Sequence, residues 1–226
     1  MSILSELPKK IGRQTLLLIC LLATMIGLPL LEHLPAGRIL LSIWFLLTSG
    51  VLLASFSGRG RQHRILFVAG GIFFFLLLAN LVIQAMGWSS AGIQMIALPY
   101  GLIFLSWVTG FILFSILKAE RVTADLVFGA VAAYLLLGIC WGGLYALIEI
   151  THPGSFSFGE GAKEFSSLFY YSFVTLTTLG YGDILPLSKI ARTAAYLEAV
   201  TGVMFTAILI AGLVGSARMG RTKGEE

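Results

Sequence analysis

The sequence predicts an all-α integral membrane protein with six membrane-spanning helices and a re-entrant segment between the fifth and the sixth. Of the 226 residues, 58% are hydrophobic and only 12% are charged, whereas roughly 25% of an ordinary globular domain is charged. The mean hydropathy is +0.94. Six apolar stretches are long enough to cross a bilayer, which takes about 20 residues in a helix, and one further apolar run is too short.

The six predicted spans follow one another along the chain with polar connections between them. They cover residues 14–31, 38–57, 65–87, 94–117, 124–149 and 189–217. The first span follows Lys9, Lys10 and Arg13, as the apolar part of a signal peptide would. No small-residue cleavage site comes after it, so we expect it to remain as a membrane anchor.

The positions of Lys and Arg predict the orientation in the membrane, because positive residues collect on the cytoplasmic side. With a cytoplasmic amino terminus, most of them lie inside, and the outer side holds Arg38, Lys163, Lys189 and Arg192. We therefore expect a multi-pass protein of the cell membrane with both termini cytoplasmic. Residues 150–188 then originate on the outer side.

Several classes of function are disfavoured by the composition. The net charge is +4, but Lys and Arg lie at the ends of apolar stretches and form no single patch, so we expect no nucleic-acid partner. Cys20 and Cys140 lie inside apolar runs, without disulfide or metal-ligand spacing. No nucleophile and base are paired within the spans, and the histidines lie in predicted loops, so we expect no enzyme and no cofactor. These histidines are His33, His63 and His152.

The short apolar run covers residues 165–178 and is followed by Leu-Gly-Tyr-Gly-Asp. A run of this length enters the membrane and leaves by the same side. Backbone without helical hydrogen bonds is tolerated there only where protein buries it or where it lines a water-filled path. Gly180 and Gly182 can adopt positive φ without steric cost, so successive carbonyl groups can turn toward one axis. In four copies, rings of oxygens would replace the water of a dehydrated monovalent cation.

Residues 164–183, EFSSLFYYSFVTLTTLGYGD, resemble the pore helix and selectivity filter of the potassium channel family. The family pattern is Thr-Val-Gly-Tyr-Gly-Asp, and Leu179 is the one departure from it. The resemblance implies a homotetrameric, potassium-selective channel that conducts passively. It implies that K⁺ is bound by Thr178, Leu179, Gly180 and Tyr181, that Gly182 completes the filter, and that the pore holds no other cofactor.

The resemblance covers residues 122–217 and so divides the chain into domains. Residues 122–217 form the expected pore domain, with an outer helix, pore helix, filter and inner helix. Residues 1–121 resemble a four-span voltage-sensor domain, but the predicted span 94–117 contains no Lys or Arg. We therefore expect no steep voltage dependence. Residues 218–226 are expected to be a short cytoplasmic tail, with no soluble ligand-binding domain, and lipids and identical subunits are the expected partners.

The same resemblance assigns supporting roles around the filter. It places the ring of Tyr181 in a cuff formed by Tyr170 and Tyr171, and it pairs Asp183 with Tyr170, where relatives usually carry tryptophan. Val174 stands where some relatives have a glutamate. Thr177 is included with these residues as filter support.

Glu149 ends the fifth span and matches a family glutamate that accepts from backbone N–H groups at the start of the inner helix, near Leu187 and Ser188 here. The alternative is a solvated charge at the membrane interface. Gly202, 20 residues after Gly182, has the spacing of the family's hinge glycine. The alternative is close packing against the fifth span, which offers Gly138, Gly142 and Gly143.

Side chains of the sixth span divide between two expected faces. Val203, Thr206 and Ile210 recur at helical spacing and are expected to line an aqueous cavity. Glu198 lies within the span and points away from them, so we expect it to be buried and hydrogen-bonded to the pore helix or the fifth span. One alternative function stays open, namely a non-conducting partner subunit or membrane sensor that assembles with other channel subunits.

Overall fold

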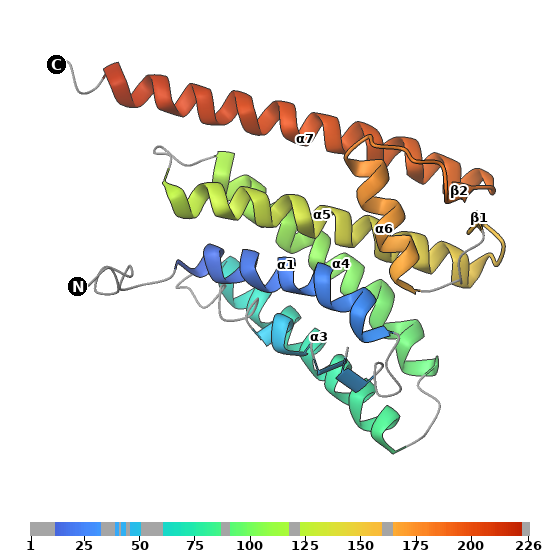
Figure 1. Cartoon of the computed structure of the whole chain (residues 1–226). Helices are drawn as coiled ribbons and strands as arrows, with labels where there is room; N and C mark the ends of the chain where they lie inside the picture. Colours follow the sequence, from blue (N-terminus) through green and yellow to red (C-terminus); the bar gives the residue numbers. More distant parts are fainter. Residues whose placement is uncertain are drawn as a thin grey trace, which may run out of the picture.

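The computed structural model describes residues 12–32, 39–40, 42–43, 46–50, 61–86, 91–117, 123–159 and 165–222. These residues form a helical bundle with one very small sheet (Figure 1). The helices are α1 (Arg13–Glu32), α3 (Arg61–Ala85), α4 (Ala91–Leu117), α5 (Ala124–Thr151), α6 (Phe165–Leu176) and α7 (Lys189–Thr222). The strands β1 (Phe156–Ser157) and β2 (Leu185–Pro186) pair antiparallel, with Phe156 opposite Pro186.

Among the described residues, four helices are long and apolar enough to cross a membrane, and they agree with four of the predicted spans. They run over Arg64–Ala85, Met95–Ile116, Ala124–Thr151 and Lys189–Gly212. The predicted first span forms helix α1, whose apolar part, Gln14–Gly27, is shorter than the other four. The predicted second span, 38–57, falls mainly outside the described residues.

Helix α5 is the centre of the bundle, because it packs against α1, α4, α6 and α7 (Figure 1). Thr123 caps its amino-terminal end, where the Thr123 hydroxyl accepts from the N–H of Leu126 at 3.2 Å. Small residues along α5 let the neighbouring helices approach closely. A Cβ at Gly138 or Gly142 would come within 3 Å of the rings of Phe173 and Phe169 of α6.

The glycines of α5 do not pack against the sixth span, which was the alternative given for Gly202 in the sequence analysis. Gly138 and Gly142 receive aromatic rings of α6, and Gly143 faces Leu102 of α4, so these glycines do not form a seam with the sixth span. The reason is the position of α6, which lies against this face of α5 (Figure 1).

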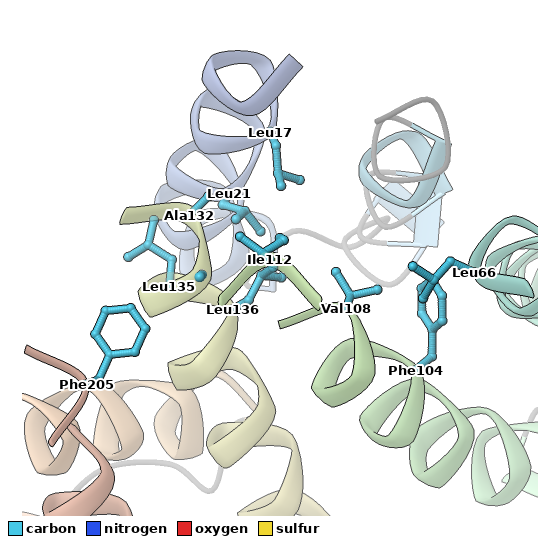
Figure 2. Packing of buried hydrophobic residues seen from close by; sticks show 11 residues of the cluster. Leu17, Leu21, Leu66, Phe104, Val108, Ile112, Ala132, Leu135, Leu136 and Phe205 are labelled. Atoms are coloured by element: carbon cyan, nitrogen blue, oxygen red, sulfur yellow. The ribbon is translucent and has the colours of Figure 1, made fainter. Parts of the chain in front are cut away.

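One apolar cluster joins the amino-terminal helices to the helices that flank α6. The cluster takes side chains from α1, α3, α4, α5 and α7, and its labelled members can be followed in Figure 2. The buried members include Leu17 and Leu21 of α1, Leu66 of α3, Phe104, Val108 and Ile112 of α4, Ala132, Leu135 and Leu136 of α5, and Phe205 of α7. A second cluster surrounds Tyr145 at the other end of α5 and fixes α6 and β1 there.

Candidate ion pathway

Helix α6 is 12 residues long and is followed by residues 177–183, which we call the filter loop. Backbone hydrogen bonds tie the start of this loop to the end of the helix. The carbonyl oxygen of Val174 accepts from the N–H of Leu179 at 2.9 Å and from the N–H of Gly180 at 3.2 Å. These bonds satisfy carbonyl and N–H groups that would otherwise be left open where the helix ends. The position of the filter loop therefore depends on the last turn of α6.

Every second residue of the filter loop has a left-handed backbone. The φ angles are 59° at Thr178, 60° at Gly180 and 78° at Gly182, and Leu179 and Tyr181 between them do not have positive φ. The prediction for the two glycines is confirmed, but Thr178 was not predicted. Alternation of hand turns successive peptide groups toward one side, as it does for the N–H groups of anion-binding nests. A β-branched residue with positive φ is strained, and such strain is common at functional sites.

The filter loop lies open on the surface of the single chain. Leu179 is 55% exposed and Tyr181 is 67% exposed. The predicted cavity-lining residues of α7 are also exposed, with Val203 at 57% and Ile210 at 56%, and Thr206 is exposed beside them. Large apolar side chains in this position need lipid or protein to cover them.

Tyr170 and Asp183 form the hydrogen bond that the sequence predicted. The phenol of Tyr170 donates to Oδ2 of Asp183 at 2.7 Å, and the N–H of Ile184 donates to Oδ1 at 3.1 Å. The hydrogen bond to Asp183 raises the pKa of Tyr170 above its ordinary value, so the phenol keeps its proton at neutral pH. The bond links the outer end of the filter loop to α6.

Tyr170→Phe removes this link and leaves the ring in place. We expect the variant to fold, and we expect a current carried by it to decline faster during sustained opening. Because the pair is exposed to solvent in the single chain, water competes with this hydrogen bond and its effect on stability should be small. Asp183→Asn and the double variant complete a mutant cycle. If the effects of the two single substitutions on the decline of the current add up to the effect of the double variant, the hydrogen bond does not brace the loop.

Tyr171 is buried within the single chain. It is only 7% exposed, and its ring centroid lies 5.0 Å from that of Tyr145 and 5.4 Å from that of Phe156. These contacts fix α6 to α5 and β1. The cuff that Tyr170 and Tyr171 are expected to form around Tyr181 stays a prediction for the assembled channel. The hydroxyl of Thr177 turns back onto α6 and donates to the carbonyl oxygen of Phe173 at 2.6 Å.

Glu149 accepts backbone hydrogen bonds, but from other groups than predicted. The N–H of Gly154 donates to Oε1 at 2.9 Å, and the N–H of Phe156 donates to Oε2 at 3.2 Å. The N–H groups of Leu187 and Ser188 donate to the carbonyl oxygen of Ser155 instead. The prediction is corrected because the turn after α5 lies between Glu149 and the start of α7.

Gly202 is a position of close packing within a continuous helix. A Cβ built there would lie 2.2 Å from the carbonyl oxygen of Leu176, at the end of α6. The sequence considered close packing, but against the fifth span, whereas the contact is with α6. Helix α7 is unbroken from Lys189 to Thr222. The absent side chain allows α7 to touch the residue that precedes the filter loop.

Glu198 is fully buried and hydrogen-bonded, as predicted. Its exposure is 0%, and the phenol of Tyr145 donates to Oε2 at 2.5 Å. The hydroxyl oxygen of Ser172 lies 2.5 Å from Oε1 and 2.8 Å from the carbonyl oxygen of Gly138. The carboxyl group thus joins α5, α6 and α7. Sequence reasoning found neither partner, because these side chains come together only in the folded chain.

Comparison with known proteins gives matches to this region and beyond it. Residues 129–217 match a protein family described as Ion channel (Ion_trans_2). The chain is 28% identical over 160 residues to the voltage-gated potassium channel Kch of Escherichia coli, covering 64% of this chain and 36% of that protein. It is 34% identical over 83 residues to two pore potassium channel c of Oryza sativa, covering 36% of this chain and 17% of that protein.

The apolar helices and the match over residues 129–217 show a helical membrane protein that contains an ion-channel domain. The two relatives are potassium channels, and the chain is similar to them. It spans about a third of the length of the bacterial relative and a smaller part of the plant one. The family is not a family of enzymes.

Proposed function

We propose that the chain is the subunit of a homotetrameric channel that lets K⁺ pass passively through the cell membrane. The alternation of backbone hand at Thr178, Gly180 and Gly182 carries this proposal, because it turns carbonyl groups of the filter loop to one side. The carbonyls of Thr178, Leu179, Gly180 and Tyr181 then replace the hydration shell of the ion. In this proposal α6 is a re-entrant pore helix.

We propose four copies because each chain carries one filter loop and rings of carbonyl oxygens around one axis need several identical subunits in closed symmetry. The exposed apolar residues of α7 support assembly. Helix α7 buries one stripe, formed by Ala191, Ala194, Glu198 and Phe205, and leaves Val203 and Ile210 exposed in its own chain. In the assembly, Val203, Thr206 and Ile210 line the inner cavity. Gly202 serves close packing and can also serve as a hinge.

The amino-terminal part is proposed to complete six spans, with both termini cytoplasmic and the pore domain at residues 122–217. A voltage sensor needs charges in the membrane, since the field supplies about 2.3 kcal/mol per charge per 100 mV. The described helix α4 contains no Lys or Arg, and it packs directly against α5. We therefore propose that gating is not steeply voltage-dependent.

The test is ion flux into liposomes that contain the purified protein. A K⁺ gradient is expected to drive uptake of a K⁺ tracer, whereas an equal Na⁺ gradient drives far less uptake of a Na⁺ tracer. Cross-linking in the same liposomes is expected to give a ladder that ends at four subunits. Absence of flux with a tetramer present would contradict the proposal and would favour the non-conducting partner subunit.

A further inference from the structure

A chain of buried hydrogen bonds around Glu198 connects α6, the proposed pore helix, to α5 and α7. It runs from the phenol of Tyr145 through the Glu198 carboxyl to the hydroxyl of Ser172 and on to the carbonyl oxygen of Gly138. Its three oxygen–oxygen distances are 2.5, 2.5 and 2.8 Å. Glu198, Ser172 and Tyr145 are each 0% exposed, so the chain of hydrogen bonds is closed off from bulk solvent.

A count of protons fixes the state of the carboxyl group. Three oxygen–oxygen contacts of hydrogen-bond length need three protons, and the hydroxyls of Tyr145 and Ser172 supply one each. The carbonyl of Gly138 has no proton, so the third belongs to Glu198. Tyr145 then donates to Oε2, Glu198 donates from Oε1 to Ser172, and Ser172 donates to Gly138.

An ionised Glu198 would leave one contact without a proton. If Ser172 donated to the carboxylate, its oxygen would face the Gly138 oxygen at 2.8 Å with no hydrogen between them. The charge would also be buried without a cationic partner in this chain of contacts, which is unfavourable. The titratable groups that face the carboxyl are the phenols of Tyr134 and Tyr145 on α5 and of Tyr171 on α6.

We propose that Glu198 is a protonated positioning residue that holds the pore helix against α5 and α7. The proposal rests on the proposed function where it concerns conduction. Ser172 lies two residues before Val174, whose carbonyl oxygen accepts from the N–H groups of Leu179 and Gly180. A shift of α6 at Ser172 therefore moves the group that anchors the filter loop.

The direction of the pH effect follows from this arrangement. Loss of the Glu198 proton at alkaline pH turns Ser172 toward the carboxylate and breaks its bond to Gly138, so the last turn of α6 loses its attachment to α5. The current should fall as pH rises, in proportion to the protonated fraction. That fraction drops about tenfold for each pH unit above the titration midpoint.

Glu198→Gln separates protonation from packing. Its amide group donates to Ser172 as the acid does, its oxygen accepts from Tyr145, and it does not titrate. We expect wild-type current at neutral pH and less than about a twofold change at alkaline pH. Asp125→Asn, which removes an exposed carboxyl in the first turn of α5, should keep the alkaline fall. An alkaline fall that persists unchanged in Glu198→Gln would overturn the proposal.

Infrared spectroscopy tests the protonation state without any current. The wild-type minus Glu198→Gln difference spectrum at neutral pH should show the carbonyl band of a protonated acid, and Tyr145→Phe should shift that band by removing a donor to Oε2. If only a carboxylate band is lost, or if Tyr145→Phe leaves the acid band unmoved, Glu198 is not the protonated bridge. A clear acid band in a protein that conducts no ions would count against the proposed function alone.

Discussion

Gly180→Ala is expected to abolish K⁺ conduction while the chain still folds and inserts. The φ angle at Gly180 is 60°, a left-handed backbone that a residue with a side chain adopts at a cost of about 1–2 kcal/mol. A Cβ at Gly180 meets no other atom of the chain within 4 Å. The substitution therefore acts on the backbone of the filter loop, whose peptide groups would leave the shared axis, and not on the packing of the helices.

The measurement is K⁺ flux per inserted protein, together with thermal stability in detergent. Gly110→Ala is the matched control, because a Cβ at this glycine of α4 also meets nothing within 4 Å and φ there is not left-handed. We expect the control to conduct like the wild type. Wild-type flux through Gly180→Ala would show that the left-handed backbone at this position is not needed.

Gly202→Ala should destabilise the pore module and reduce conduction. Its Cβ would lie 2.2 Å from the carbonyl oxygen of Leu176, a backbone atom that cannot rotate away. Helices α6 and α7 must separate to accept it. Overpacking of this kind typically costs 1–3 kcal/mol, and here it displaces the residue directly before the filter loop.

The effect should appear as a lower midpoint of thermal unfolding and a reduced flux, measured beside Gly71→Ala in α3. Gly71 is also inside a helix but has open space around a built Cβ, so alanine there should be neutral or slightly stabilising. If Gly202→Ala and Gly71→Ala unfold at the same temperature, the close contact of Gly202 with α6 is not maintained.

The sequence was most informative where the physical requirement is local. Span length and apolarity located α3, α4, α5 and α7, because a bilayer fixes the length of its helices. The glycine spacing predicted the left-handed positions 180 and 182. The buried carboxyl of Glu198 followed from helical phase alone.

The errors arise where two distant segments meet. Glu149 accepts from Gly154, and Gly202 touches Leu176, and each partner depends on how the segments around α5, α6 and α7 lie against one another. Spacing along one chain does not determine such contacts. The left-handed φ of Thr178 was missed because threonine does not favour it, and only the hydrogen bonds at the end of α6 explain why the chain turns there.

The central position of α5 has a consequence for the amino-terminal helices. Helices α1 and α4 pack on the same helix that supports α6. Phe205 of α7 belongs to the same cluster as Leu17 of α1 and Val108 of α4 (Figure 2). The amino-terminal helices are therefore joined to α7 by one continuous cluster of apolar side chains.

The most direct test of the account is the reversal potential of the reconstituted protein in a planar bilayer with different K⁺ and Na⁺ concentrations on the two sides. Carbonyl oxygens that replace the hydration of K⁺ predict a shift of about 59 mV for each tenfold change in the K⁺ gradient, and almost none for a change in the Na⁺ gradient. A reversal potential that follows the K⁺ and Na⁺ gradients equally would contradict the account of a K⁺-selective filter.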